Sequence, residues 1–271
     1  MANPDVVLCE VDSGVATVTL NRPGAANGWT GELQERYFEL LAQCDADPAV
    51  KAIVVTGAGK TFCPGADMNM LQGIGASNES SGGNAGDSVT RSSRPLHFPT
   101  MLTKPTIGAI NGACAGVGLV QALMLDVRFS APGVKYTLAF ARRGLIAEYG
   151  AAWLLPRLVG QSRALDLLMS SRVVLAEEAL TMGLVNRVVA ADQLLDEARA
   201  YAYDVATNCS PTSMAVMKRQ INHSYGQTLD EAMDEAFGLM NKSLKRTDFK
   251  EGVASYVQKR PPQFAPITGD L

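Results

Sequence analysis

Histidine is scarce in this chain of 271 residues, and a surplus of basic residues is missing. His97 and His223 are the only two histidines, so a site built from several histidine ligands is excluded. Acidic residues number 27 against 24 lysines and arginines, which gives a formal net charge of −3. Nucleic-acid-binding proteins usually carry the opposite balance. We therefore expect neither a metal ion nor a nucleic acid among the ligands.

Long apolar runs and paired cysteines are missing as well. No apolar stretch reaches the length that a bilayer-spanning helix needs, and the first residues lack the basic start of a secretory signal. The five cysteines are an odd number and are scattered without paired spacing, which favours reduced thiols in a cytosolic protein. They are Cys9, Cys44, Cys63, Cys114 and Cys209. We expect a cytoplasmic protein that does not bind membranes.

The elements that are present alternate between strands and helices. An alternating pattern over residues 7–20, interrupted by Asp12-Ser13-Gly14, predicts a β-hairpin. Thr30 is a suitable N-cap for a helix through about Asp45. Apolar strands at 51–56 and 104–110, the second followed by a helix at about 116–125, predict an α/β fold.

The second half of the chain differs in character. From about residue 161 it is mostly helical, with predicted stretches near 192–207, 211–224 and 228–245. We predict a core over residues 1–190 and a helical oligomerisation segment over 191–271. Residues 73–94 form a low-complexity run rich in Gly, Ser and Asn, which is typical of an active-site lid or of surface disorder.

Three motifs that suggest other chemistries fail on inspection. The run Gly57-Ala58-Gly59-Lys60-Thr61 follows a strand, but Val54 stands where a phosphate-binding loop needs glycine. In the dinucleotide-binding pattern that begins at Gly116, the third glycine is replaced by Gln121. The run 160–164 resembles a nucleophile elbow, yet no strand precedes it and no histidine follows in the required order.

Two turns of small residues are more informative. In residues 111–118, every side chain after Asn111 except Val117 is small or absent, and the run opens a helix whose free N–H groups favour negative charge. A second such turn, Phe62 to Met68, follows the strand at 51–56. Each has the properties of half an oxyanion hole, although tight helix packing explains either one equally well alone. Together they predict two amide donors for one carbonyl oxygen.

An ordered set of segments over residues 5–260 resembles the enoyl-CoA hydratase/isomerase family, the crotonases. The matching segments are Asn21 to Asn27, Val55 to Gly59, Phe62 to Asp67, Lys104 to Gly112, Gly144 to Ile146, Leu155 to Gly160, Ala176 to Leu180, Gly183 to Asn186, Phe249 to Gly252 and Lys259-Arg260. The resemblance implies a crotonase-type spiral of ββα units with a C-terminal helical trimerisation segment. It also implies homotrimers, often stacked as homohexamers.

The resemblance also implies where an acyl-CoA substrate binds. The oxyanion donors would be the N–H groups of Ala66 and Val117, although valine is bulkier than the family's glycine and disfavours positive φ. Tyr256 and Lys259 would reach the nucleotide end of the substrate. The residues expected along the coenzyme A groove are Ala25, Ala26, Ala66, Asp67, Met68 and Gly116. Coenzyme A is then part of the substrate, and no separate cofactor is expected.

The departure from the family pattern concerns the acids. The two positions at which family hydratases carry glutamates hold Val120 and Phe140 here, whereas Glu148 resembles the catalytic glutamate of the family's isomerases. A single carboxylate suits proton transfer from C2 to C4, so the sequence favours double-bond isomerisation. Two alternatives remain: a hydratase that uses Glu148 with an ordered water, and an acyl-CoA-binding homologue without catalysis. A surface glutamate at a helix start is the plain structural explanation of Glu148.

Overall fold

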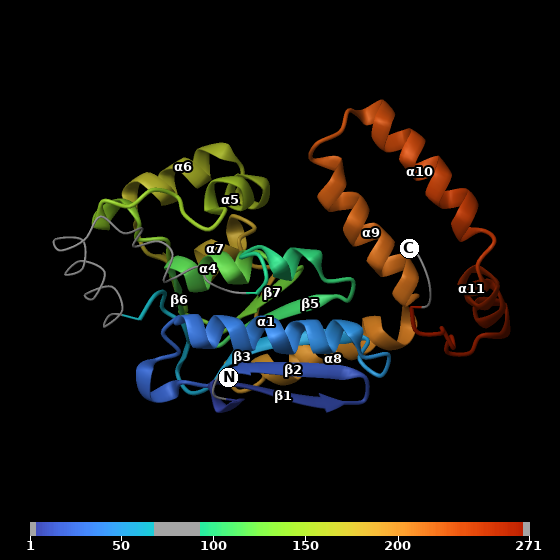
Figure 1. Cartoon of the computed structure of the whole chain (residues 1–271), viewed down its shortest axis with the longest axis horizontal. Coiled ribbons are helices and arrows are strands. Elements are labelled where there is room, and N and C mark those ends of the chain that lie inside the picture. Colours follow the sequence, from blue (N-terminus) through green and yellow to red (C-terminus); the bar gives the residue numbers. More distant parts are fainter. Residues whose placement is uncertain (1–3, 68–92, 268–271) are drawn as a thin grey trace.

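A six-stranded sheet forms the base of the molecule in the computed structural model, which describes residues 4–67 and 93–267 (Figure 1). The predicted hairpin is present: β1 and β2 pair antiparallel, whereas each later pair in this sheet is parallel. The strands in spatial order are β1 (Val7–Asp12), β2 (Val15–Leu20), β3 (Ala52–Gly57), β5 (Thr106–Ile110), β7 (Val127–Ser130) and β10 (Arg187–Val188).

A smaller second sheet is built from the strands that follow those of the first. In spatial order it contains β4 (Thr61–Cys63), β6 (Ala113–Ala115), β8 (Lys135–Thr137) and β9 (Val174–Leu175). Along the chain β3 leads into β4, β5 into β6 and β7 into β8, so each turn of the chain adds one strand to each sheet. This repeat is the predicted spiral of ββα units, and the predicted α/β class is confirmed.

Helix α1 (Gly31–Ala46) begins where the sequence predicted it to begin. The Thr30 side chain accepts a hydrogen bond from the Leu33 N–H at 3.2 Å, and Asp47 is the C-cap. Its apolar side packs against the β1–β2 hairpin. The residues that α1 buries are Leu33, Gln34, Tyr37, Phe38, Leu40, Leu41 and Cys44.

The remaining helices of the core cover the two sheets. They are α4 (Gly116–Leu123), α5 (Ala151–Val159), α6 (Gln161–Ser170), α7 (Ala176–Thr181) and α8 (Leu194–Asn208), and short 3-10 turns occur at Pro4–Val6, Pro23–Ala25, Phe98–Met101 and Ala141–Arg143. Helix α8 packs against β2, β3, β5 and β7. Its buried Ala198, Ala202 and Ala206 follow a spacing of four residues, so their small side chains line one face and allow a close approach.

Three C-terminal helices extend away from the sheet (Figure 1). Helices α9 (Pro211–Ser224) and α10 (Leu229–Ser243) were predicted, whereas α11 (Thr247–Gln258) was not. The division of the chain at residue 190 stays a prediction. The packing of α8 on the sheet joins residues 194–208 to the core layers, and the chain leaves the sheet only after α8.

Other expectations concern what the chain lacks. The run 73–94 lies almost entirely outside the described residues. Over residues 4–67 and 93–267, no helix is long and apolar enough to cross a membrane. Nor do the described side chains form a group of three or more His, Cys, Asp or Glu that could hold a metal ion.

Candidate active site

The two turns of small residues lie side by side. Strand β4, which leads into the first turn, pairs in parallel with β6, which leads into the second, and their partners include Cys63 with Cys114. Directly after these strands, the backbone at Gly65 lies close to the backbone at Ala115 and Gly116. A Cβ atom added to Gly65 would lie 3.2 Å from the Ala115 carbonyl oxygen, and one added to Gly116 would lie 3.6 Å from the Gly65 Cα. The pairing of the second sheet thus brings the two predicted donor segments together.

The Ala66 amide occupies a bridge that leaves its N–H unused. Trp29 donates its N–H to the Gly65 carbonyl at 2.8 Å, and Asp67 donates to the Trp29 carbonyl at 3.0 Å. Ala66 lies between these two bonded positions, so its own N–H points to the other side of the bridge. Over the described residues this N–H donates no backbone hydrogen bond. Its role as an oxyanion donor stays a prediction.

The Val117 amide lies in the first turn of α4. Ala115 is the N-cap and has no side-chain oxygen that could accept from the first amides of the helix. Such amides have no partner within a helix, and the helix dipole adds positive potential there. The positive φ, 51°, falls on Gly116, so Val117 escapes the left-handed strain that its branched side chain disfavours. The expected difficulty at Val117 is thus absent, because the preceding glycine makes the turn.

Gly118 fixes how closely α4 approaches β4. A Cβ atom at this position would lie 2.3 Å from the Cys63 carbonyl oxygen and 2.6 Å from its Sγ, which no real side chain tolerates. The small residue is required because the helix start packs directly on the strand. Close packing therefore explains Gly118, while the donor role of the neighbouring Val117 amide stays a prediction.

A third loop, residues 22–28, lies against the Ala66 turn. Arg22 forms an ion pair with Asp67 at 3.2 Å and also donates to the Gly28 carbonyl. The fully buried Asn27, at φ 60°, donates to the carbonyls of Ala58 and Thr61 at 3.0 and 2.7 Å. These bonds hold the loop that carries the exposed Ala25 and Ala26 against Asp67. The place of these residues in a coenzyme A groove stays a prediction.

Asn111 joins the end of β5 to the end of β3. Its Nδ2 donates to the carbonyls of Gly57 and Gly59 at 2.8 and 3.0 Å, and its Oδ1 accepts from the Gly57 N–H at 3.2 Å. The run 57–61, which lacks the glycine of a phosphate-binding loop, is thus held by the side chain that opens the turn of residues 111–118. Its role is structural, because it aligns the two turns.

Glu148 stands in the turn that enters α5. Its carbonyl accepts from the Ala151 N–H at 2.9 Å, and the next residue, Tyr149, has a left-handed φ of 55°. The Glu148 side chain is partly buried, and this burial raises the pKa of its carboxyl. Burial and the nearby Glu148 charge also raise the pKa of Tyr149. Because α5 packs against α4, Glu148 belongs to the layer that lies over the Val117 helix.

The two positions that hold glutamates in family hydratases are part of the core. Val120 and Phe140 are both buried among apolar side chains. Neither can transfer a proton. The carboxylate that remains for such a role in this neighbourhood, among the described residues of the α4 and α5 entrances, is Glu148.

Two predicted substrate-binding residues lie elsewhere in the chain. Tyr256 is 85% exposed on α11, and Lys259 is the left-handed C-cap of that helix. Figure 1 shows α11 at the end of the molecule opposite β6, which leads into the Val117 turn. A single chain therefore does not bring these two residues to the paired turns. Met68, also predicted for the groove, lies outside the described residues.

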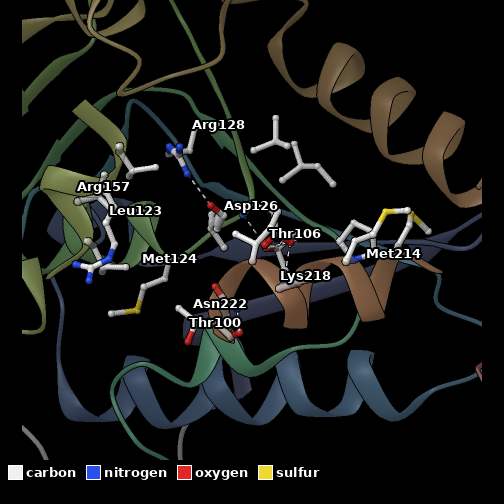
Figure 2. Close-up of a pocket in the computed structure, with 18 of the residues that line it drawn as sticks. Thr100, Thr106, Leu123, Met124, Asp126, Arg128, Arg157, Met214, Lys218 and Asn222 are labelled. Carbon is white, nitrogen blue, oxygen red and sulfur yellow. Dashed lines mark hydrogen bonds and ion pairs between the residues drawn. The ribbon is translucent and has the colours of Figure 1, made fainter. Parts of the chain in front are cut away.

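A cavity of about 580 Å³ lies apart from the paired turns (Figure 2). It is lined by the end of α4, by residues around Asp126, and by α5, α8 and α9. The Asp126 carboxylate accepts from the Thr106 N–H and hydroxyl at 2.8 and 2.9 Å and from Lys218 at 2.9 Å. Arg157 lies over the rings of Trp153 and Tyr225. These charged groups already have partners, and neither Ala66 nor Val117 lines this cavity.

The chain belongs to the enoyl-CoA hydratase/isomerase family, whose model matches residues 10–266. A 1,2-epoxyphenylacetyl-CoA isomerase of Escherichia coli is 36% identical over 96% of this chain and 98% of that protein. A probable enoyl-CoA hydratase of Mycobacterium bovis is 31% identical over 96% of this chain and 98% of the relative. The family assignment made from the sequence is therefore confirmed.

Solved structures agree with the fold. A probable enoyl-CoA hydratase/isomerase from Mycobacterium abscessus superposes with a TM-score of 0.86 at 31% identity, covering 96% of this chain and 99% of that one. An enoyl-CoA hydratase from Mycobacterium marinum is 46% identical, with a TM-score of 0.69 over 82% of this chain and 100% of that one. The spiral fold and the helical C-terminus are thus those of the family.

Proposed function

We propose that this chain binds an enoyl-CoA thioester and moves its double bond, with Glu148 as the proton carrier. Membership of the family supports an acyl-CoA enzyme. The observation that carries the isomerase proposal is the state of the acids: Glu148 is a partly buried carboxyl with a raised pKa, whereas Val120 and Phe140 are apolar core residues. One carboxylate is enough to move a proton, because the same group takes it and returns it.

The two free amides would stabilise the charge that develops on the thioester oxygen. Removal of a C2 proton from a 3-enoyl-CoA leaves a dienolate, whose negative oxygen would accept from the N–H groups of Ala66 and Val117. These donors are held by backbone packing, at the Trp29 bridge and at Gly118 on Cys63, so little reorganisation accompanies the reaction. The start of α4 adds its dipole to the same point.

Glu148 would carry the proton from C2 to C4. The carboxylate takes the C2 proton, the double bond shifts into conjugation with the thioester, and the carboxylic acid then protonates C4. No atom is gained or lost overall. A raised pKa brings the group closer to the operating pH and so favours transfer in both directions. Hydration by Glu148 with an ordered water is the competing reaction. The name of the M. bovis relative, a probable enoyl-CoA hydratase, supports this alternative.

The proposed isomerase activity also has support among the relatives. The E. coli protein at 36% identity is named as an isomerase of an acyl-CoA, although of an epoxide rather than an alkene. The name of this relative supports isomerisation of an acyl-CoA as the reaction class, and we propose an alkene rather than an epoxide as the reacting group of the substrate. Coenzyme A would enter as part of the substrate, along the loop that Arg22 and Asp67 hold together.

The distance between α11 and the paired turns bears on assembly. We propose that Tyr256 and Lys259 serve the groove of a neighbouring copy in a homotrimer or homohexamer. The exposed apolar side chains of α10 and α11 favour such an assembly, because an isolated chain leaves them in water. A cytoplasmic location is part of the same proposal, and the five unpaired cysteines favour it.

Turnover on a panel of 2-enoyl- and 3-enoyl-CoA esters tests the proposal. Isomerisation and hydration are followed separately for the wild type, Glu148→Gln and the control Glu10→Gln, whose side chain is exposed on β1. We expect wild-type isomerisation that falls by about 100-fold or more in Glu148→Gln, with acyl-CoA affinity nearly unchanged. Hydration without isomerisation would favour the water mechanism. Tight binding of every ester without turnover would contradict the enzyme proposal and favour an acyl-CoA-binding protein without catalysis.

A further inference from the structure

Two cysteines that lie 35 positions apart in the sequence are neighbours in space. Cys9 is in the middle of β1, opposite Val18 of β2, and Cys44 is in the last turn of α1. Their Sγ atoms are 3.6 Å apart, and both are free thiols. A disulfide has a sulfur–sulfur distance of about 2.05 Å, so the two atoms need to approach by roughly 1.5 Å. Helix α1 packs against β1, which holds the pair together.

The environment makes the two thiols unequal. The hydrogen bond with the Cys44 thiol and the nearby Arg36 guanidinium together lower the pKa of Cys9 to about 7, against the opposing effects of burial and of the Glu10 charge. The pKa of Cys44 is raised, first by the same hydrogen bond and then by burial. Cys9 is also the more exposed of the two. The greater exposure of Cys9, together with its lowered pKa, favours Cys9 as the nucleophile and Cys44 as its partner.

The three other cysteines lack this combination. Cys63 and Cys114 face each other across β4 and β6, but both are fully buried and burial raises the pKa of each thiol, that of Cys63 to about 12. Cys209 is an exposed residue at the end of α8. Partial burial of its sulfur atom and the charge of Asp204 raise the pKa of its thiol. All five cysteines lie in the described part of the chain, where only Cys9 and Cys44 make a thiol–thiol contact.

We propose that Cys9 and Cys44 form an oxidation site for hydroperoxides, at which the chain forms a reversible internal disulfide. The Cys9 thiolate attacks one oxygen of hydrogen peroxide and becomes a sulfenic acid, while the other oxygen leaves as hydroxide and takes a proton to form water. The Cys44 sulfur then attacks the sulfenic sulfur, the S–O bond breaks, and the leaving hydroxide takes the Cys44 proton. Two thiols and one peroxide thus give one disulfide and two waters.

The site is independent of the proposed enzyme activity. The pair links β1 to the C-terminal end of α1, whereas the free amides of Ala66 and Val117 lie beyond β4 and β6. The oxidation state of the two thiols is measured directly and does not depend on enzyme activity. Failure of the isomerase proposal therefore does not affect this inference, and failure of this inference does not affect the isomerase proposal. A thiol reductant reopens the disulfide by exchange.

Peptide mapping of the folded, full-length protein tests the site. The wild type is treated with a small excess of hydrogen peroxide, free thiols are alkylated, and the digest is analysed without reduction. We expect a Cys9–Cys44 peptide that is lighter by two hydrogen atoms and that disappears on reduction. Cys63 and Cys114 should be alkylated only after unfolding. A wild type in which Cys9 and Cys44 both remain alkylatable after peroxide treatment, or pair with other cysteines, overturns the proposal.

Variants separate the two roles. Cys44→Ser should stop the reaction at a Cys9 sulfenic acid, which dimedone traps. Cys9→Ser should lower the rate of peroxide consumption by at least about tenfold, because the remaining thiols are mostly protonated at neutral pH. Cys209→Ser is the matched control and should leave both the rate and the cross-link unchanged. An unchanged rate in Cys9→Ser contradicts the assignment of the nucleophile.

Discussion

Helices α1 and α10 have nearly the same length but opposite relations to the rest of the chain. Helix α1 has 16 residues and buries a full apolar face against the sheet, whereas α10 has 15 and buries none of its side chains within the described structure. The exposed apolar residues of α10 are Leu229, Met233, Phe237 and Met240. The first helix completes its packing inside one chain. The second contacts α9 but leaves these four apolar side chains without a partner among the described residues, and the assembly proposal assigns them to a surface of a neighbouring copy.

The core and the C-terminal helices α9 to α11 differ in the same way as these two helices. The core around the two sheets contains the apolar cluster, the free amides and Glu148. The C-terminal helices contribute few buried residues and carry Tyr256 and Lys259. We infer that the core determines stability and chemistry, while the C-terminal helices determine assembly. Four substitutions test this division, and they follow from the largest expected effect to the smallest.

The largest effect should come from a cavity in the core. Leu41 is fully buried in α1, so Leu41→Ala should lower the free energy of unfolding by about 2 to 5 kcal/mol. Leu229→Ala in α10 is the matched control, because Leu229 is 78% exposed, and its effect should stay within about 0.5 kcal/mol. Urea unfolding at low protein concentration measures both. Equal losses from the two substitutions would contradict the division.

Loss of one oxyanion donor should have the next largest effect. Val117→Pro removes the amide hydrogen in the first turn of α4, where proline is tolerated, and should raise the barrier by about 2.7 to 4 kcal/mol. Val117→Ala keeps the donor and is the matched control. Steady-state kinetics should show a fall in kcat for the proline variant with little change in ground-state affinity. Circular dichroism checks that both variants fold, and near-normal kcat in folded Val117→Pro would place the donor elsewhere.

A charge on α10 should break the assembly while the core stays folded. Phe237 is 53% exposed in the single chain, and losing the burial of such a side chain at an interface costs about 1.5 to 3 kcal/mol. Phe237→Asp should therefore weaken association by roughly 10-fold or more per contact, which sedimentation velocity measures. If Tyr256 and Lys259 serve a neighbouring groove, acyl-CoA affinity falls in parallel. A wild type that is monomeric at micromolar concentration would contradict the assembly proposal itself.

The smallest effect concerns the pH dependence of stability. The raised pKa of Glu148 means that the folded state binds its proton more tightly than the unfolded state does. Ionised Glu148 therefore destabilises the fold above the folded pKa, and this cost disappears as the pH falls below the unfolded value near 4.5. Glu148→Gln should unfold at a slightly higher temperature than the wild type at pH 8, with the difference vanishing in acid. Thermal melts across this range, with Glu10→Gln as control, decide the point.

Much of the core could be predicted because its signals are local. Thr30 marks the start of α1, Ser13 and Gly14 mark the hairpin turn, and small residues mark both donor segments. The two turns predicted a pair of amide donors, and the family resemblance then named Ala66 and Val117 within them. The structure then showed that the positive φ belongs to Gly116.

What escaped prediction depends on distant contacts. Asn27 holds its loop through carbonyls more than 30 positions away, and Asn111 reaches back to Gly57 over 54 positions. An asparagine in a turn is too common for its sequence alone to reveal such roles. The cysteines seemed scattered for the same reason, since Cys9 and Cys44 meet only when α1 packs on the hairpin. Helix α11 was missed because no capping side chain marks its start at Arg246 and because Gly252, a poor helix former, lies inside it.

The contact between Gly118 and Cys63 has a consequence for how this chain tolerates change. The amide hydrogen at position 117 belongs to the backbone, so every residue except proline offers it, while the Val117 side chain packs in the buried apolar core. The residues on either side have no such freedom, since Gly116 provides the left-handed turn and a side chain at 118 collides with Cys63. Substitutions at position 117 other than proline therefore keep the amide hydrogen and change only the packing around it, whereas substitutions at 116 or 118 disrupt the turn that holds it.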